Sequence, residues 1–321
     1  MANKVAAVTG SNKGIGYATV AELCRRGVTT VYLCSRDVGR GKAAVENLKK
    51  EGFNPLFHQL DITDKGSVRA FAAHLKGKHG GLDILINNAA EITTEFIKTT
   101  YNDARKVIDT NYNSAFIIQE YLYPILKDNA RVINISSDCG HISNLNNKYW
   151  IERLTKNDVK VEDVNAFVDW FLDSVRNETL KVEDFKEPFF LPYRISKIAL
   201  CALTRIQQRE IGRGISINSL HPGFVQTDMT KTVVPEYLVE LMKQNPKLTE
   251  HLGRVPLEKS GEAPAYLALD VDQSVKGRYF WHDKTEKDWA DPNLDVLAKS
   301  EDFKKVMKNS GIEIPNLQPI Y

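Results

Sequence analysis

Two side chains that could move a proton lie four residues apart in the segment Tyr193-Arg194-Ile195-Ser196-Lys197. Positions i and i+4 are neighbours on a helix surface, so the phenol and the ammonium should point the same way. A tyrosine hydroxyl titrates near ~10, and a close cation would favour its anionic form. The spacing therefore indicates a general acid or base, although Tyr-x-x-x-Lys also arises by chance.

A glycine-rich turn stands where the first apolar run, Val5-Ala6-Ala7-Val8, meets the first amphipathic stretch. Its glycines are Gly10, Gly14 and Gly16, in the pattern G-x-x-x-G-x-G. Glycine permits a tight turn and lets backbone N–H groups approach a pyrophosphate at the positive end of a helix. The turn predicts a dinucleotide site.

The end of the second apolar run bears on the choice between NAD and NADP. Asp37 follows Gly16 by 21 residues (37 − 16 = 21) and could bind the ribose 2′-hydroxyl of NAD. Arg36 and Lys13 would instead face the 2′-phosphate of NADP. Two cations for one phosphate favour NADP, with Asp37 turned to solvent or paired with Arg40.

Short apolar runs alternate with amphipathic stretches, first over residues 5–135 and again after residue 193. Continuous apolar runs suit strands buried on both faces, and repeated β-α-β units pair their strands in parallel. We therefore expect one α/β domain over 1–321, a doubly wound parallel sheet of the Rossmann type. The expected strands are 5–8, 31–34, 56–60, 82–86, 131–135, 215–220 and 277–281; the expected helices are 15–26, 38–51, 66–77, 100–126, 193–209 and 264–269.

Three segments do not fit this alternation of strands and helices. Residues of about 145–190 are predicted to form a helical insertion before the tyrosine, because apolar positions recur there at helical spacing. An excursion over about 229–256 contains a short helix at 237–242 and could be a substrate lid. A C-terminal extension over about 282–321 carries one expected helix at 296–307.

The amino-acid composition limits the kinds of partner that the protein could bind. There are 43 Lys and Arg against 41 Asp and Glu, and this net charge of +2 gives no field suited to nucleic acid or an anionic membrane. The four cysteines show no CxxC spacing, the histidines no metal-ligand spacing, and no stretch approaches the length of a membrane span. We expect a cytoplasmic protein without a metal, acting on a small molecule.

Together the motifs resemble the short-chain dehydrogenase/reductase family. The resemblance runs from residue 5 to about 281, in the family's order, through Thr9-Gly10-x3-Gly14-x-Gly16, Asn87-Asn88-Ala89, Asn111, Ser137 and Tyr193-x3-Lys197. A closer similarity, to the monomeric NADPH-dependent carbonyl reductases, is carried by Asn12-Lys13-Gly14-Ile15-Gly16, Arg36-Asp37, Phe57-His58-Gln59-Leu60-Asp61 and Gly80-Gly81-Leu82-Asp83.

The resemblance implies a catalytic set. Tyr193 would donate a proton to the substrate carbonyl oxygen, and Ser137 would orient that oxygen. Lys197 would lower the tyrosine pKa and bind the nicotinamide ribose, while Asn111 would hold a water that links Lys197 to solvent. The hydride would come from NADPH, and no metal is required.

The resemblance also implies binding residues. Asp61 would accept a hydrogen bond from the adenine amino group, although a helix N-cap explains it equally well. The expected cofactor-binding residues are Gly10, Asn12, Lys13, Gly14, Ile15, Gly16, Arg36, Asp61, Ile62, Asn88, Ala89, Tyr193, Lys197, Val225, Gln226 and Thr227. The expected substrate residues are Ser137, Ile142, Phe224 and Met229.

Two departures from the family pattern stand out. Ala90 replaces a glycine after Asn-Asn-Ala, and Tyr193 follows Ser137 by 56 residues (193 − 137 = 56). The long separation is similar to the insertion that blocks the usual oligomer interface in carbonyl reductases, so we expect a monomer. The implied activity is reduction of ketones, aldehydes or quinones. The alternatives are a dedicated reductase of one prostaglandin, pterin, terpenoid or hormone, and an NADPH-binding regulator without turnover.

Overall fold

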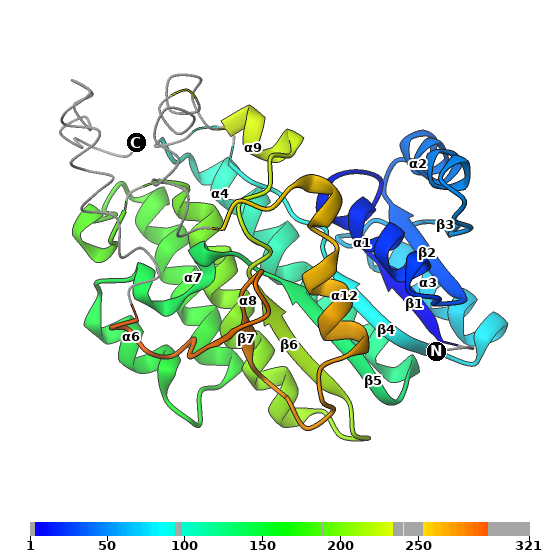
Figure 1. Cartoon of the computed structure of the whole chain (residues 1–321). Helices are drawn as coiled ribbons and strands as arrows, with labels where there is room; N and C mark the ends of the chain where they lie inside the picture. The colour runs from blue at the N-terminus through cyan, green and yellow to red at the C-terminus, as the bar shows by residue number, and fades with distance from the viewer. Residues whose placement is uncertain are drawn as a thin grey trace.

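An eight-stranded sheet forms the centre of the protein. A computed structural model describes residues 4–93, 95, 98–187, 189–233, 240 and 253–294. The strand order is β3-β2-β1-β4-β5-β6-β7-β8, parallel except for the last pair (Figure 1). The strands are β1 (Val5–Val8), β2 (Thr30–Ser35), β3 (Leu56–Gln59), β4 (Leu82–Asn87), β5 (Leu126–Ile135), β6 (Ser216–Leu220), β7 (Tyr279–Phe280) and β8 (Glu286–Lys287). The doubly wound sheet predicted from the sequence is confirmed.

Helices cover both faces of this sheet. They include α1 (Gly14–Arg25), α2 (Val38–Lys50), α3 (Lys65–His79), α4 (Tyr101–Ile108), α5 (Ser114–Leu122), α8 (Leu191–Glu210), α9 (Asp228–Val233) and α12 (Glu262–Leu269). Val8 belongs to a buried cluster with side chains of α1, α2 and α12, whereas Ala7 belongs to another with side chains of α3 and α5. Successive residues of a strand point to opposite faces, so one short apolar run supplies two cores.

The helix expected over 100–126 is interrupted. After α4 the chain forms a π-helical turn at Asp109–Asn113, continues as α5, and ends in a 3₁₀ turn at Tyr123–Ile125. Pro124 lies in that last turn, where its ring and missing N–H oppose a continued α-helix. Strand β5 therefore begins at Leu126, five residues (131 − 126 = 5) before the predicted start. Strand β8, two residues long, was not predicted.

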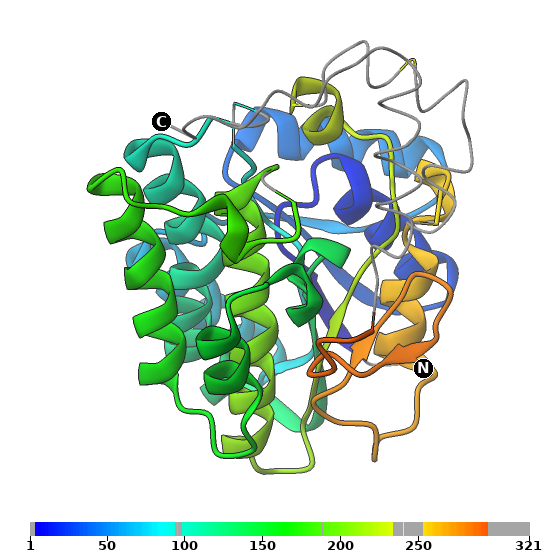
Figure 2. The same ribbon diagram turned by 90° about the vertical axis from the view of Figure 1, so that its left-hand side faces the viewer.

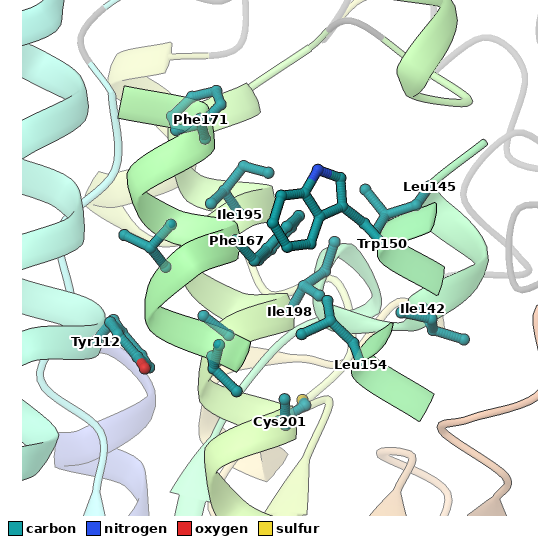
Figure 3. Close-up of a cluster of buried hydrophobic side chains, with 14 of the residues drawn as sticks. Tyr112, Ile142, Leu145, Trp150, Leu154, Phe167, Phe171, Ile195, Ile198 and Cys201 are labelled. Atoms are coloured by element: carbon teal, nitrogen blue, oxygen red, sulfur yellow. The ribbon is translucent and has the colours of Figure 1, made fainter. Parts of the chain in front are cut away.

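The helical insertion lies before α8, where the sequence predicts it. It contains α6 (Lys148–Thr155), α7 (Val161–Arg176) and a 3₁₀ turn at Val182–Asp184, and an isolated bridge joins Leu145 to Phe185 at its base. Helix α7 packs against α4 and α8, and Figures 1 and 2 show these helices side by side at one end of the molecule. Figure 3 shows Trp150 and Phe167 of the insertion facing Ile195 and Ile198 of α8.

Two predicted helices, at 237–242 and 296–307, lie outside the residues that the structure describes, apart from residue 240. Of the predicted excursion, the described part includes α9 and residues 253–256. The described part of the extension adds β8 to the sheet edge, and Trp289 to the cluster around α7 and α8. Within the described residues, no helix is long and apolar enough to cross a membrane.

Candidate active site

The glycine turn between β1 and α1 requires glycine at each predicted position. Gly10 and Gly14 have φ values of +61° and +63°, in the left-handed region that side chains disfavour. A Cβ atom added to Gly16 would lie 2.5 Å from Nδ2 of Asn88 and 2.8 Å from Cα of Ser11. The backbone of the turn therefore passes closer to its neighbours than any side chain would allow.

The first turn of α1 is open to an anion. Its N-cap residue, Lys13, makes no side-chain capping hydrogen bond, whereas α2, α3 and α4 are capped by Asp37, Asp64 and Thr100. The first turn of α1 also contains no acidic residue. Backbone N–H groups at the positive end of a helix bind phosphate when no side chain occupies them. The residues present thus fit the pyrophosphate of a dinucleotide, with Asn12 and Ile15 partly exposed beside it.

The end of β2 presents an exposed arginine and an engaged aspartate. Arg36 is exposed, whereas Oδ1 of Asp37 accepts the Arg40 N–H at 2.7 Å, and Oδ2 lies 3.4 Å from the Arg40 guanidinium. The Arg40 amide and side chain lower the pKa of Asp37. Asp37 therefore caps α2 and pairs with Arg40, which is the arrangement predicted together with NADP.

Lys13 differs from the expectation. Its Nζ lies 3.0 Å from Oδ2 of Asp228, so this structure does not show it as the second cation for a phosphate held by Arg36. Both side chains are more than half exposed, at 56% and 63%. An ion pair in such a position is worth little, so a phosphate could displace Asp228 from Lys13.

Asn88 and Ala89 hold the glycine turn from the end of β4. The Asn88 side-chain amide donates to the Thr9 and Gly10 carbonyl oxygens at 2.9 and 3.1 Å. The backbone N–H groups of Asn88 and Ala89 both donate to Oγ1 of Thr9 at 3.0 Å. These contacts make both residues supports of the turn that would hold the cofactor.

Asp61 and Ile62 follow β3. Oδ1 of Asp61 accepts hydrogen bonds from the N–H and the hydroxyl of Thr63, at 2.9 and 2.7 Å. The N-cap of α3 is Asp64, so the N-cap interpretation of Asp61 is wrong. Ile62 is 8% exposed and packs in the core with α3, which leaves its backbone, and not its side chain, for a cofactor.

The loop after β6 lies beside the glycine turn at Thr227. A Cβ atom added to Gly14 would lie 3.5 Å from Cγ2 of Thr227, which places residues 225–227 beside the start of α1. Val225 is buried, Gln226 is exposed, and the Thr227 N–H donates to Oγ1 of Thr230 at 2.9 Å. The predicted position of this loop over the nucleotide site is consistent with the geometry.

Tyr193 and Lys197 lie on α8, which begins at Leu191 with Pro192 in its first turn. Nζ of Lys197 lies 5.4 Å from the centre of the Tyr193 ring and donates to the Ile135 carbonyl oxygen at 2.8 Å. Lys197 is only 2% exposed, and this burial lowers its pKa to about 8. The ammonium therefore faces the end of β5 as well as the phenol.

The expected lowering of the Tyr193 pKa is not found. Burial of the hydroxyl raises the pKa, and the thiol of Cys139 and the carboxylate of Asp138 raise it further, while the Ser137 hydroxyl acts in the opposite direction. Loss of water disfavours the anionic form of a phenol, and Lys197 is itself made less basic by burial. Tyr193 thus holds its proton through the neutral pH range in this structure.

Ser137 lies two residues beyond the end of β5, and its hydroxyl is near enough to Tyr193 to lower the pKa of the phenol. Its hydroxyl donates to Oδ1 of Asp138 at 2.7 Å and accepts from the Cys139 N–H at 3.3 Å. The hydroxyl of Tyr279 donates to the Ser137 carbonyl oxygen at 2.8 Å, which fixes the backbone there. The predicted serine and tyrosine therefore meet, and they meet beside a carboxylate that the sequence analysis did not identify.

Asn111 lies in the π-helical turn between α4 and α5. Its side chain donates to the Glu91 carbonyl oxygen at 2.8 Å and to Oγ of Ser196 at 2.9 Å, and it accepts from the Glu91 N–H at 2.8 Å. The residue is 5% exposed. Its side-chain amide thus links the segment after β4 to α8. π-Helical turns of this kind often occur at functional sites. The water-holding role stays a prediction.

The predicted substrate residues separate into two groups. Ile142 is 0% exposed and packs in the core cluster of α7 and α8, as Figure 3 shows, so it does not line an open pocket as expected. Ile142 lies in a short 3₁₀ turn, Ile142–Asn144, where the sequence shows no periodic pattern that would predict burial. Phe224, in the loop after β6, and Met229, on α9, are partly exposed and remain candidates.

Comparison with known proteins agrees with this geometry. A family model described as short chain dehydrogenase matches residues 4–149, and one described as enoyl-(acyl carrier protein) reductase matches residues 183–284. Carbonyl reductase [NADPH] 1 of Sus scrofa is 33% identical, over 90% of this chain and 95% of that protein. Its counterpart in Bos taurus is 35% identical, over 83% of this chain and 91% of that protein.

Solved structures of reductases also superpose on this chain. Salutaridine reductase from Papaver somniferum superposes with a TM-score of 0.73 at 27% identity, over 87% of this chain and 99% of that chain. Menthone neomenthol reductase from Mentha piperita gives a TM-score of 0.69 at 27% identity, over 88% and 99%. A parallel sheet, an open glycine turn and a half-buried Tyr193 beside the buried Ser137 and Lys197 define a dinucleotide-dependent oxidoreductase. The chain belongs to the short-chain dehydrogenase/reductase family.

Proposed function

We propose that this protein, an NADPH-dependent oxidoreductase, reduces ketones, aldehydes or quinones, with Tyr193 as the proton donor. The observation that carries the proposal is that the buried Lys197 has its Nζ 5.4 Å from the centre of the Tyr193 ring, while the Ser137 hydroxyl is near enough to Tyr193 to lower its pKa. The similarity to two carbonyl reductases [NADPH] supports it.

The cofactor, when bound, supplies the hydride. The chain's own residues then have separate tasks. Tyr193 holds a proton at its hydroxyl, ready for the oxygen of the carbonyl group, because burial raises its pKa. Ser137 offers a second hydroxyl at the same place. Lys197 uses one of its three N–H bonds on the Ile135 carbonyl oxygen, and the family resemblance gives the others to the nicotinamide ribose.

The choice of NADPH over NADH is supported at the end of β2. Asp37, which could have bound a ribose 2′-hydroxyl, is engaged as the cap of α2. Arg36 is exposed beside it, and a guanidinium matches the geometry of a phosphate. These contacts favour a 2′-phosphate at this position.

Two observations favour an enzyme that reduces a substrate over an NADPH-binding regulator without turnover. Tyr193 and Lys197 are both present, and they lie on the same side of α8. The hypothesis of a dedicated reductase of one metabolite stays open, because the excursion over about 229–256, which could be a substrate lid, lies mostly outside the described part of the chain.

A cofactor-oxidation assay tests the proposal. The purified protein is mixed with NADPH or NADH and with a panel of quinones, diketones and aliphatic aldehydes, and the cofactor absorbance is followed. We expect oxidation of NADPH with several carbonyls and slower oxidation of NADH. Measurable NADPH binding without oxidation by any carbonyl would refute the enzymatic function and favour a regulator; activity with one metabolite alone would favour the dedicated reductase.

We also propose that the protein is a monomer. The apolar face of α7 packs on α4 and α8, and Phe167 and Phe171 of α7 share one buried cluster with Ile195 of α8 (Figure 3). Ile108 of α4 belongs to the same cluster. A second chain could not pack on the same surfaces of α4 and α8 without displacing α7. Sedimentation velocity should give a single species near 36.3 kDa. A dimer or tetramer at micromolar concentration would contradict this proposal.

A further inference from the structure

The serine of the proposed active site begins a short segment, residues 137–141, which we call the serine turn. Its centre is a 3₁₀ turn at Asp138–Gly140, and the Ser137 hydroxyl caps this turn by accepting the Cys139 N–H at 3.3 Å. The same hydroxyl donates to Oδ1 of Asp138 at 2.7 Å. Both of these partners belong to the serine turn itself, so the shape of the turn sets the direction of the Ser137 hydroxyl.

The serine turn packs closely against α8. A Cβ atom added to Gly140 would lie 2.9 Å from the Lys197 carbonyl oxygen, which is closer than a side chain allows. Helix α8 also carries Tyr193, whose ring lies near the Lys197 ammonium. A shift of the serine turn along α8 would therefore change the position of Ser137 relative to Tyr193.

A second set of contacts reaches the serine turn from residues 279–289, which we call the C-terminal hairpin. It consists of β7, β8, the residues between them, and the two residues that follow β8. The Tyr279 hydroxyl donates to the Ser137 carbonyl oxygen at 2.8 Å. The indole N–H of Trp289 donates to the Gly140 carbonyl oxygen at 2.6 Å. The hairpin thus holds the serine turn at its first and fourth residues.

The fifth residue of the serine turn makes a contact in the opposite direction. Nε2 of His141 lies 2.9 Å from the Asp288 carbonyl oxygen, which can only accept, so this ring nitrogen carries the proton. Nδ1 of His141 accepts the Ser143 N–H at 3.2 Å. The neutral imidazole is therefore a third link between the serine turn and the hairpin.

These three links are shielded from water. Tyr279, Trp289 and His141 are 2%, 4% and 0% exposed. Water cannot easily replace a buried hydrogen bond, so its loss leaves a polar group with one partner fewer. The Ser137 carbonyl oxygen also accepts the Gly140 N–H at 2.9 Å, so it would keep one donor if the Tyr279 hydroxyl were removed.

The hairpin is itself held firmly. Strand β7 pairs with β6 in parallel, with Tyr279 opposite Ser219, and β8 pairs with β7 in antiparallel register (Figure 1). Trp289 packs in the buried cluster that contains side chains of α7 and α8. The donors that reach the serine turn therefore belong to the sheet and to the core, so they can fix the turn instead of moving with it.

We propose that the C-terminal hairpin fixes the serine turn, with Tyr279 and Trp289 as positioning residues for Ser137. Their hydrogen bonds keep the Ser137 hydroxyl at a constant place beside Tyr193, and neither residue has to touch the substrate or the cofactor. The rate of a reaction falls steeply when a group that orients the substrate is displaced by a fraction of an ångström. This inference rests on the proposed function.

The first part of the test measures rates with the full chain. Tyr279→Phe removes the hydroxyl and keeps the ring, and Trp289→Phe removes the indole N–H. We expect each substitution to lower kcat for reduction of one carbonyl by about tenfold, because the Ser137 hydroxyl is less well placed. The NADPH dissociation constant should stay within about twofold of the wild-type value.

The second part is a double-mutant cycle with Ser137→Ala. If Tyr279 acts through the Ser137 hydroxyl, Tyr279→Phe should change kcat by less than about twofold when that hydroxyl is already absent. Trp289→Phe should behave in the same way and provides a second cycle if Tyr279→Phe does not fold. Single-turnover measurements, with protein in excess of NADPH, follow the slow rates of the Ser137→Ala proteins.

Two control variants remove comparable contacts elsewhere. Tyr123→Phe deletes another buried tyrosine hydroxyl, which donates to Oε1 of Gln207 at 3.0 Å. Glu286→Gln deletes an exposed ion pair with Arg278, at 3.4 Å, on the hairpin side away from the serine turn's hydrogen bonds. Both controls should leave kcat within about twofold of the wild-type value.

Hydrogen exchange provides a measurement that does not depend on turnover. Amides of the serine turn should exchange about tenfold faster in Tyr279→Phe than in the wild-type protein, because the turn opens more readily. The same amides should exchange at the wild-type rate in Tyr123→Phe. Unchanged exchange in Tyr279→Phe would show that the hairpin does not fix the turn and would overturn the inference.

The kinetic outcomes are equally distinct. Equal losses of kcat in the wild-type and Ser137→Ala backgrounds would overturn the inference, because Tyr279 and Trp289 would then support the fold without acting through Ser137. Unchanged kcat in both single variants, or an equal loss in Tyr123→Phe, would also overturn it. A wild-type protein that binds NADPH and reduces no carbonyl would instead refute the proposed function itself.

Discussion

The glycine turn and the proposed catalytic centre lie at the same edge of one sheet but are built from different parts of the chain. The turn consists of backbone, supported by short hydrogen bonds from Thr9 and Asn88. The proposed catalytic centre consists mainly of buried side chains brought together from the segment after β5, α8 and the segment after β6, among them Ser137, Lys197 and His221. We therefore expect the first site to bind by shape and the second to depend on charges held away from water.

This difference explains why the two sites respond differently to change. A backbone site loses function when an added atom fills its space, and the loss should appear in cofactor affinity. A site of buried side chains loses function when one charge or proton is altered, and the loss should appear in the rate and its pH dependence. The predictions below separate these two responses.

The largest effect on the nucleotide site should follow Gly16→Ala. The new methyl group would lie 2.5 Å from Nδ2 of Asn88 and 2.8 Å from Cα of Ser11, so the turn must shift. We expect the NADPH dissociation constant, measured by fluorescence titration, to rise by about ten- to a hundredfold. The control Gly77→Ala lies on α3 with no heavy atom within 4 Å of its new Cβ and should bind normally. Equal affinity in both variants would contradict a shape-based site.

A smaller and more selective effect should follow Arg36→Ala. Loss of the exposed guanidinium should raise the NADPH dissociation constant about tenfold and leave that of NADH nearly unchanged, because NADPH alone carries the 2′-phosphate. Arg40→Ala is the matched control, since Arg40 is exposed on the next turn and pairs with Asp37. If both cofactors weaken equally in Arg36→Ala, the phosphate contact is wrong.

The smallest effect should come from the insertion and should leave the catalytic rate unchanged. Asp163 accepts the Lys160 N–H at 3.0 Å at the start of α7, and it pairs with Arg153 and Lys156 at 2.8 and 3.0 Å. Burial opposes its charge, but these three partners lower its pKa to about 2. We expect Asp163→Asn to lower the free energy of unfolding in urea by about 1–2 kcal/mol at pH 7.

The sign of the pH dependence follows from the lowered pKa. The contribution of Asp163 should be fully present above its unfolded pKa of ~4 and should disappear as the pH falls through about 2. The stabilities of the wild-type and Asp163→Asn proteins should therefore converge in that range. Asp173→Asn, which removes an exposed partner of Arg176, should change stability much less. A constant difference between wild type and Asp163→Asn down to pH 2 would contradict the account.

The sequence predicts the nucleotide site better than the catalytic centre. Gly10, Gly14 and Gly16 are informative locally, because glycine spacing reports directly on the backbone of a turn. Tyr193 and Lys197 are found by helical spacing, but the pKa of Tyr193 is raised by burial and by Cys139 and Asp138, of which Asp138 lies 55 residues earlier (193 − 138 = 55). Such a contact leaves no periodic signal in the sequence.

Three further features could not be predicted for the same reason. Asp138 and His221 meet only because β5 and β6 are neighbours in the sheet. The burial of Ile142 depends on how the insertion folds back over α8. The π turn around Asn111 adds a residue to one helical turn without changing the apolar pattern around it. Asp138 directly follows Ser137 in the sequence, and this adjacency was the one signal that could have indicated it.

The central claim is that Tyr193 gives the proton while the glycine turn binds the cofactor independently of it. Tyr193→Phe removes the hydroxyl and keeps the ring, so it should lower kcat for carbonyl reduction about a thousandfold and leave the NADPH dissociation constant within about twofold. Steady-state turnover and fluorescence titration on the same preparation measure both quantities. A Tyr193→Phe protein that reduces carbonyls at a rate comparable to wild type would contradict the account.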